Sequence, residues 1–235
     1  MARVIIALDV PTLDEALGLV DSLGKGTDCY KVGLELFTRE GPSVVQALAG
    51  RDKRIFLDLK LYDIPNTVAR AVARARELGV ELLTLHTTGG RRMMAAAAEA
   101  AGDDLTLLGV TVLTSMTPSD VEDSWGRGVG SIEEEVVRLA RLARASGVGG
   151  VVASVREVVA IKKAVGSDLV VVTPGIRLAG DDAHDQARSS SPADAVAAGA
   201  DYLVIGRSVT QAPDPAEALR RVCEAMAGPS AVGTA

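Results

Sequence analysis

The stretch Arg54-Ile-Phe-Leu-Asp-Leu-Lys-Leu-Tyr-Asp-Ile-Pro-Asn-Thr67 places charged side chains in a run whose apolar flanks predict burial. Residues 54–59 have the length and the apolar side chains of a short strand. Because side chains alternate along a strand, Asp58 and Lys60 are predicted to project together from its C-terminal end. On its own, an Asp-x-Lys pair is more often a structural ion pair, so the rest of the chain must decide its role.

A helix is predicted to follow this strand, since Pro65 loses no hydrogen bond in the first turn of a helix. Asp63 then lies in the loop between strand and helix. The same strand-then-helix unit recurs along the chain. The predicted strands are residues 4–8, 29–32, 54–59, 82–85, 105–113, 148–153, 169–172 and 202–205. The predicted helices are residues 13–23, capped by Thr12, and residues 42–48, 66–78, 93–101, 132–145, 155–165 and 215–226.

Eight such units predict an α/β fold, a single-domain (β/α)8 TIM barrel. A doubly wound sheet is disfavoured because no Gly-x-Gly-x-x-Gly follows the first strand. With 48% hydrophobic but only 3% aromatic residues, the core must consist of aliphatic side chains, which suits parallel strands covered by helices. The barrel is expected to span residues 1–227, and the small, polar tail at residues 228–235 is expected to be disordered.

Composition also excludes several classes of partner. A net charge of −6 argues against binding to nucleic acid or to a membrane surface. Asp9 comes too early for a signal peptide, and no apolar run approaches about 18 residues, so a soluble cytoplasmic protein is expected. Cys29 and Cys223 lack the spacing of metal ligands and are predicted to be buried free thiols. With only two histidines, no metal site is expected.

Charges of alternating sign follow the first three predicted strands: Asp9, Lys31, and Asp58 with Lys60, then Asp63 one loop turn later. In a (β/α)8 barrel the site is built where the strands end, and neighbouring strands lie about 4.8 Å apart. Burying such a set costs several kcal/mol per ion, which favours a functional over a purely structural network. A lysine between carboxylates stays protonated, and this suits Lys60 to donate a proton or to stabilise an anion.

The loops after the seventh and eighth strands predict a phosphate site. They contain Gly175-Ile-Arg177 and Gly206-Arg207-Ser208, and barrels often bind phosphate at these two loops. The segment 177–191 is longer and more polar than a simple connection, which is seldom above about 12 residues. It is predicted to be a mobile lid that contacts the ligand through Arg177 and Gln186, with a flexible surface loop as the alternative.

With these residues assembled, the chain resembles the orotidine 5′-phosphate decarboxylase family from residue 4 to about residue 226. The segment Asp58-Leu-Lys-Leu-Tyr-Asp-Ile-Pro-Asn-Thr67 is similar to the signature of that family. The supporting matches are Ala7-Leu-Asp9, Lys31-Val-Gly33, Val112-Leu-Thr-Ser-Met116, Thr173-Pro-Gly-Ile-Arg177, Asp185-Gln186 and Val204-Ile-Gly-Arg207.

The resemblance implies a carboxy-lyase that needs no cofactor and converts orotidine 5′-phosphate to uridine 5′-phosphate and carbon dioxide, the last step of de novo pyrimidine synthesis. Lys60 would protonate C6 of the pyrimidine. The other implied catalytic residues are Asp58, Asp63 and Lys31. The implied substrate-binding residues are Asp9, Lys31, Thr67, Thr114, Pro174, Arg177, Gln186, Gly206 and Arg207. The resemblance also implies a homodimer in which Asp63 and Thr67 reach into the partner's site.

Two alternatives remain open. One is a magnesium-dependent sugar-phosphate decarboxylase or aldolase of the related barrel group, of the 3-keto-L-gulonate 6-phosphate type, which resembles this chain in its Asp-x-Lys-x-x-Asp core. Ile64-Pro-Asn-Thr67 and Gln186 favour the pyrimidine enzyme over it. The other is a catalytically silent nucleotide-binding barrel, against which the intact Lys60 and Asp58 argue.

Overall fold

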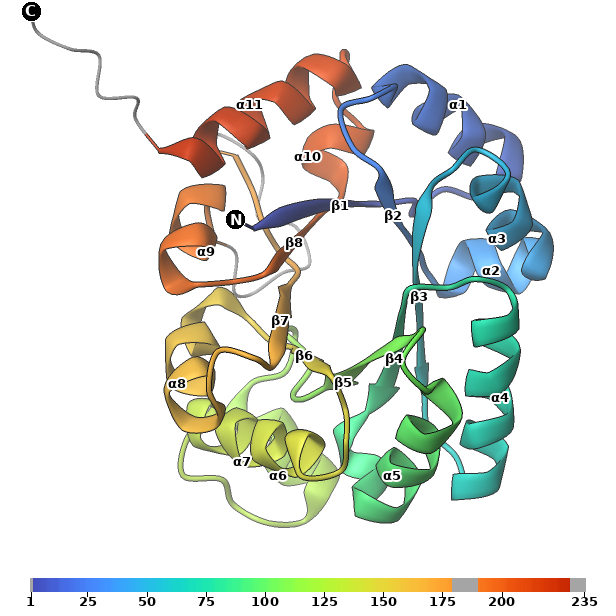
Figure 1. The fold of residues 1–235 in the computed structure, drawn as a ribbon. Helices are drawn as coiled ribbons and strands as arrows, with labels where there is room; N and C mark the ends of the chain where they lie inside the picture. Colours follow the sequence, from blue (N-terminus) through green and yellow to red (C-terminus); the bar gives the residue numbers. More distant parts are fainter. Residues whose placement is uncertain (1, 179–189, 229–235) are drawn as a thin grey trace, which may run out of the picture.

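Eight parallel strands close into a barrel with helices around it (Figure 1). The computed structural model describes residues 2–178 and 190–228. The strands pair in chain order, and β1 pairs with β8 to close the sheet. They are β1 (Arg3–Ala7), β2 (Cys29–Val32), β3 (Arg54–Leu61), β4 (Leu82–His86), β5 (Thr106–Val110), β6 (Gly150–Val152), β7 (Val170–Thr173) and β8 (Tyr202–Ile205). The predicted single-domain (β/α)8 barrel is therefore confirmed.

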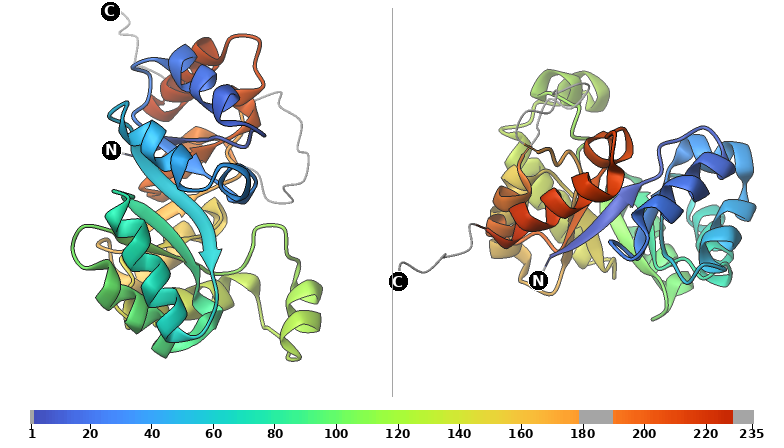
Figure 2. Two further views of the ribbon diagram at one scale, coloured as in Figure 1. Left: turned by 90° about the vertical axis from the view of Figure 1, so that its right-hand side faces the viewer. Right: turned by 90° about the horizontal axis from the view of Figure 1, so that it is seen from above.

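Helices connect the strands and cover the outside of the barrel. They are α1 (Leu13–Leu23), α2 (Leu34–Glu40), α3 (Pro42–Ala49), α4 (Pro65–Glu77), the short 3-10 helix η1 (Thr87–Gly89), α5 (Gly90–Ala101), α6 (Pro118–Trp125), α7 (Ile132–Arg144), α8 (Val155–Val165), α9 (Pro192–Ala198), α10 (Arg207–Thr210) and α11 (Pro215–Ala227). Figure 2 shows α6 standing out from the barrel on the side away from the N-terminus. None of the described helices is long and apolar enough to cross a membrane.

The prediction was wrong about some helices and strand ends. It missed α2, α6, α9 and α10, made the fifth and sixth strands too long, and ended the third strand two residues early. β5 ends at Val110 because β6 offers it only three partners, Gly150–Val152. Two of the missed helices carry a recognisable start signal. Thr117 and Ser191 each form a capping box with an aspartate three residues later. That pattern could have revealed α6 and α9 in the sequence.

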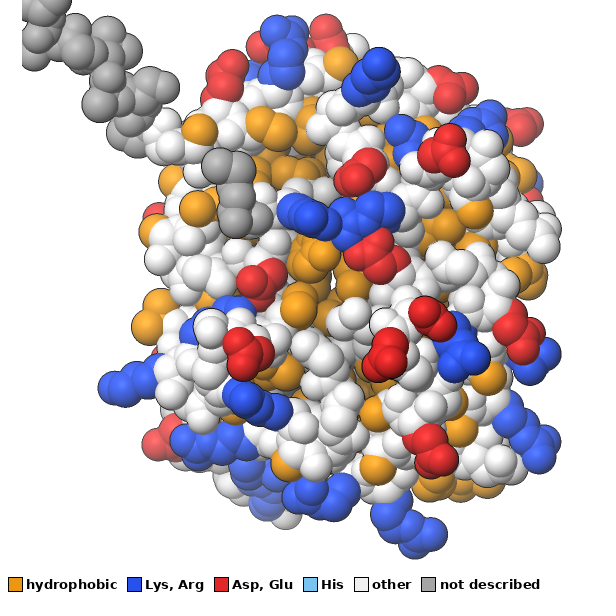
Figure 3. Space-filling view, viewed as in Figure 1, with side chains coloured by type: hydrophobic (Ala, Val, Ile, Leu, Met, Phe, Trp, Pro, Cys, Tyr) orange, Lys and Arg blue, Asp and Glu red, His pale blue; other side chains and the backbone are white. Residues whose placement is uncertain are grey.

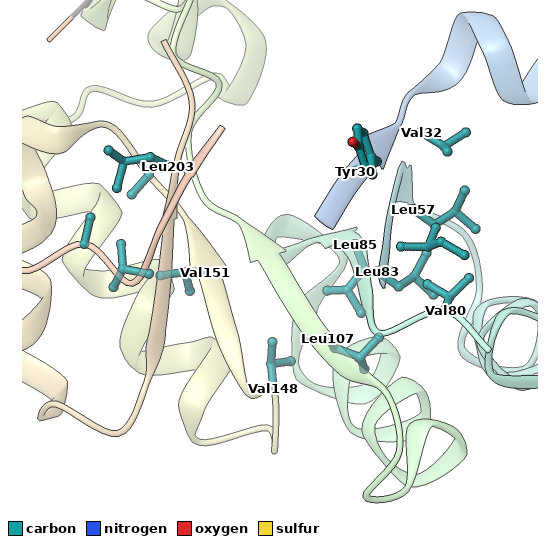
Figure 4. Close-up of a cluster of buried hydrophobic side chains, with 14 of the residues drawn as sticks. Tyr30, Val32, Leu57, Val80, Leu83, Leu85, Leu107, Val148, Val151 and Leu203 are labelled. Carbon is teal, nitrogen blue, oxygen red and sulfur yellow. The ribbon is translucent and has the colours of Figure 1, made fainter. Parts of the chain in front are cut away.

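Alternation along the strands separates two apolar layers. Side chains of one phase fill the barrel interior: Ile5, Ala7, Cys29, Phe56, Leu82, Leu108, Val172 and Val204. Side chains of the other phase pack under the helices, and Figure 4 shows part of this layer, including Val32, Leu57, Leu83 and Leu107. On β2 and β3, the next interior positions after Cys29 and Phe56 are Lys31 and Asp58. The interior therefore changes from apolar to charged toward the end where the strands terminate.

The opposite end of the barrel is closed by a separate polar cluster. Figure 3 views this end, and acidic and basic side chains meet near its centre. Arg54 donates hydrogen bonds to both carboxylate oxygens of Glu81 and, at 3.2 Å, to the hydroxyl of Tyr202. Asp28 lies 3.7 Å from the same guanidinium. Arg54 thus has acidic partners of its own, and this cluster is accounted for as a structural ion-pair network. The charges at the other end of the barrel are the ones that require a chemical explanation.

Candidate active site

A cavity of about 270 Å³ opens at the end of the barrel where the strands terminate. Most of the residues that the sequence singled out line it. They are Asp9, Lys31, Asp58, Lys60, Thr114, Pro174, Arg177, Gly206 and Arg207. The floor is apolar and includes Ala7, Phe56, Val110, Val172 and Val204. The cavity thus combines an apolar base with a charged rim, as small-molecule sites commonly do.

One side of the cavity carries four charges in alternating order, as predicted. The ammonium of Lys31 lies 2.9 Å from Oδ1 of Asp9 and 3.7 Å from Oδ2 of Asp58. The ammonium of Lys60 donates to both carboxylate oxygens of Asp58 at 2.9 Å. Only the middle of this row is well buried: the side chains of Lys31 and Asp58 are 11% and 14% exposed, whereas that of Asp9 is 58% exposed. Burial of Lys31 and Asp58 therefore carries the largest desolvation cost in this row. The attraction between the paired charges must offset that cost.

Simple alternation does not bring Lys60 to Asp58. Between Leu57 and Leu61 the register of β3 against β4 shifts, so that three residues of β3 stand opposite one residue of β4, Thr84. Within this bulge, Lys60 has φ of 51°, a left-handed conformation that is uncommon for residues with a side chain. Bulges of this kind redirect side chains next to functional sites. The predicted proximity is thus confirmed, but it depends on a bulge that the sequence did not reveal.

Thr84 lies opposite the bulge and is a site residue that was not predicted from the sequence. The backbone N–H of Lys60 donates to the Thr84 hydroxyl at 2.8 Å, and that hydroxyl donates to Oδ1 of Asp58 at 2.9 Å. Thr84 is fully buried. A threonine within an apolar strand is ordinary, so no sequence signal distinguished it.

Gly33 is a second residue whose position matters. A Cβ at this site would lie 2.9 Å from the ammonium of Lys31 and 3.2 Å from Oδ1 of Asp9. Contacts below 3.0 Å essentially never occur for a real Cβ. The glycine therefore leaves the room in which the Lys31–Asp9 pair forms. In the sequence, Gly33 is distinguished only by the resemblance of Lys31-Val-Gly33 to the family pattern.

A second, cationic group lies in the loops after β7 and β8. Arg177 and Arg207 line the cavity together with the glycines that precede them, Gly175 and Gly206. Nη1 of Arg177 donates to the hydroxyl of Ser208 at 3.4 Å. Its Nε is buried and has no hydrogen-bond acceptor among the atoms of the described residues. A buried guanidinium N–H without an acceptor is costly, so this position suits an anionic ligand.

Two of the predicted site residues that the structure describes do not line this cavity. Asp63 and Thr67 are exposed, and neither lines it. Oδ1 of Asp63 instead accepts a hydrogen bond from the backbone N–H of Ile64 at 2.6 Å. Gln186 and most of the predicted lid lie outside the described residues.

His86, at the end of β4, borders the charged row. Its ring makes an edge contact with that of Tyr62, with 5.8 Å between the centroids. Burial, followed by the nearby ammonium of Lys60, lowers the pKa of His86 below its ordinary value, while Asp58 opposes the shift. This shift favours the neutral imidazole, so His86 adds little positive charge beside Lys60. Among the described residues, no group of three or more His, Cys, Asp or Glu could hold a metal ion.

Comparison with known proteins agrees with the family resemblance seen in the sequence. The model of the "Orotidine 5'-phosphate decarboxylase / HUMPS family" matches residues 2–222. An orotidine 5′-phosphate decarboxylase of Photobacterium profundum is 47% identical over 230 residues, which cover 96% of this chain and 98% of the relative. One of Chromohalobacter salexigens is 48% identical over 232 residues, 96% of each chain. The crystal structure of orotidine 5′-phosphate decarboxylase from Lactobacillus acidophilus aligns with a TM-score of 0.84 at 34% identity and covers 96% of this chain and 99% of its own.

Proposed function

The chain belongs to the orotidine 5′-phosphate decarboxylase / HUMPS family and is an enzyme that decarboxylates orotidine 5′-phosphate in pyrimidine biosynthesis, and we propose that Lys60 supplies the proton for this reaction. The observation that supports the proposal is the pairing of the Lys60 ammonium with both oxygens of Asp58, 2.9 Å away, at the rim of the cavity. A protonated amine held in place by a carboxylate at a cavity rim can stabilise a developing carbanion and donate a proton to it.

The reaction breaks the bond between C6 and the carboxylate carbon and leaves the electron pair on C6. Carbon dioxide departs, and a proton from the Lys60 ammonium forms the new C6–H bond. Lys60 then recovers a proton from solvent. An ammonium fixed before the reaction stabilises the developing negative charge without solvent reorganisation, which is the most effective form of electrostatic catalysis.

The neighbouring charges position the substrate in this proposal. Asp58 lies against the departing carboxylate, and Lys31 with Asp9 binds the ribose hydroxyls. Lys31 is well placed for this because Asp9 holds its ammonium at 2.9 Å. Thr114, which lines the same cavity, contacts the base.

The cationic loops bind the phosphate. Arg177 offers a buried Nε for which the described residues supply no acceptor, and Arg207, Gly206 and Pro174 line the same side of the cavity. Gln186 is assigned to the phosphate on sequence grounds alone. Binding energy from this distant group can be used to organise the charged end of the site.

We also propose that the enzyme acts as a homodimer in which Asp63 and Thr67 complete the partner's site. Both residues are exposed, and two large apolar side chains beside them, Tyr62 and Ile64, are 62% and 66% exposed. Solvent exposure of such neighbours is typical of a contact surface. Mixing inactive Lys60→Ala and Asp63→Ala chains should then restore activity, because a hybrid dimer has one site with both native residues. Failure of the mixture to regain activity would contradict the shared site.

Cytoplasmic action is a further proposal, supported by the two free cysteines. Cys223 is exposed, which corrects the expectation that both thiols are buried.

The proposed activity is tested by following the absorbance change of orotidine 5′-phosphate with purified protein, with and without a chelator. We expect turnover to uridine 5′-phosphate that the chelator leaves unchanged. Loss of activity with chelator would favour the magnesium-dependent sugar-phosphate chemistry, and substrate binding without release of carbon dioxide would favour a silent barrel. The matched control is Lys60→Ala, which should bind the product but not turn over.

A further inference from the structure

The bulge in β3 creates a hydrogen-bonding problem at the residue that carries the proposed chemistry. With three residues of β3 opposite Thr84 alone, the backbone N–H of Lys60 has no ladder partner on β4. An unpaired N–H at this depth is costly. The hydroxyl of Thr84 accepts this hydrogen bond at 2.8 Å. Thr84 is 0% exposed, so water cannot take the place of its hydroxyl as the acceptor.

The same hydroxyl also determines the orientation of Asp58. A threonine hydroxyl has a single proton, and because the oxygen accepts from Lys60, that proton goes to Oδ1 of Asp58 at 2.9 Å. Oδ1 therefore receives two donors, the Thr84 hydroxyl and the Lys60 ammonium, each at 2.9 Å. The backbone of Lys60, its ammonium, Asp58 and Thr84 form one closed ring of hydrogen bonds.

We propose that Thr84 is a positioning residue for the decarboxylation, and this inference rests on the proposed role of Lys60. Thr84 lies beneath the charged row and does not line the cavity. It acts by holding Lys60 in its left-handed conformation, φ 51°, and by fixing the carboxylate toward which the ammonium points. Without the hydroxyl, the bulge can relax and the ammonium can leave the position where charge develops. Small displacements of a catalytic group lower the reaction rate strongly, because the group must match the geometry of the transition state.

The test compares variants that keep or remove the hydroxyl. Thr84→Val keeps the branched side chain but puts a methyl group where the hydroxyl makes its hydrogen bonds. Thr84→Ala removes the hydrogen bonds without that methyl contact, and Thr84→Ser keeps the hydroxyl. Thr87→Val is the matched control, since Thr87 is also fully buried and its hydroxyl donates one hydrogen bond, 2.8 Å to the backbone carbonyl of Val110 rather than to a charged side chain. For each variant, kcat, KM for orotidine 5′-phosphate, affinity for uridine 5′-phosphate and melting temperature are measured.

We expect kcat of Thr84→Val and Thr84→Ala to fall by about 10- to 100-fold, the usual effect of losing a hydrogen bond to a charged group. KM and product affinity should stay within about threefold, because the phosphate and ribose contacts are untouched. Thr84→Ser should recover most of kcat, and Thr87→Val should keep kcat even if its melting temperature falls as far as that of Thr84→Val.

The proposal is overturned if either hydroxyl-free variant at position 84 keeps kcat within twofold of the native enzyme. It is equally overturned if Thr84→Ser is as slow as Thr84→Ala, or if Thr87→Val loses kcat to the same extent. Inactivity of the native enzyme on orotidine 5′-phosphate would instead reject the proposed function, so the two failures are distinguishable.

Discussion

Replacing Gly33 by alanine adds one methyl group beside the Lys31–Asp9 pair without straining the backbone. Gly33 has φ of −93° and ψ of −176°, an extended conformation that alanine adopts freely. The added Cβ would lie 2.9 Å from the Lys31 ammonium and 3.2 Å from the Asp9 carboxylate. The ammonium must therefore retreat by about 0.5 Å to restore ordinary contact.

The size of the effect follows from what the Lys31 ammonium would lose. Its side chain is 11% exposed, so solvent only partly replaces the hydrogen bond to Asp9, 2.9 Å long. A hydrogen bond between charged groups contributes about 1.5 to 3 kcal/mol. Both contacted atoms are the ends of flexible side chains, and Asp9 is 58% exposed, so Gly33→Ala weakens the pair without abolishing it. We therefore expect kcat/KM to fall by about 3- to 30-fold, since about 1.4 kcal/mol corresponds to a factor of ten.

The assay is steady-state decarboxylation of orotidine 5′-phosphate, with Gly18→Ala as the matched control. A Cβ at Gly18, on α1, meets no atom within 4 Å, and alanine there should raise helix stability by up to about 1 kcal/mol without altering kcat/KM. If Gly33→Ala keeps kcat/KM within twofold of the native value, the spacing of the Lys31–Asp9 pair does not contribute to catalysis.

Three further predictions concern groups outside the charged row. Arg207→Ala should raise KM for orotidine 5′-phosphate, and phosphite should stimulate native turnover of a substrate that lacks the phosphate; absence of stimulation would show that phosphate binding does not assist the chemistry. At pH 8, a thiol reagent should modify Cys223 but not Cys29, because burial raises the pKa of Cys29 to about 12; two reactive thiols in the native protein would contradict this. Hydrogen bonds from Arg138 and then Arg127 lower the pKa of Glu135, so its contribution to stability is present above its unfolded pKa and is lost as pH falls through the folded pKa. Glu135→Gln should therefore lower stability by about 1 kcal/mol at pH 7, since both arginines are half exposed, and the difference from the native protein in thermal melts should shrink below about pH 4; a constant difference would count against the ion pair.

The barrel and most of its charged rim were predictable from the sequence because both follow from simple periodicities. Side chains alternate between the two faces of a strand, so Lys31, two residues after Cys29, and Asp58, two residues after Phe56, also point into the barrel. The rule that barrel sites lie where strands end then brings these residues to one cavity with Arg177.

Features that depend on contacts between distant segments were not predictable in this way. The bulge at Lys60 arises from the register between β3 and β4, which no local pattern records. The role of Thr84 follows from that register, and the role of Gly33 follows from the path of a side chain two residues earlier. The positions proposed for Asp63 and Thr67 involve a second chain, so neither the sequence nor one protomer can supply their geometry.

The central claim is that the Lys60 ammonium, held by Asp58, protonates the carbon that loses carbon dioxide. Its most direct test is the single-turnover rate of Lys60→Ala with orotidine 5′-phosphate, measured beside the affinity of the same variant for uridine 5′-phosphate. The claim predicts a loss of rate of about 10⁴-fold or more, the combined effect of a lost general acid and a lost fixed charge, with product affinity changed by less than about tenfold. A variant that decarboxylates within tenfold of the native rate would contradict it.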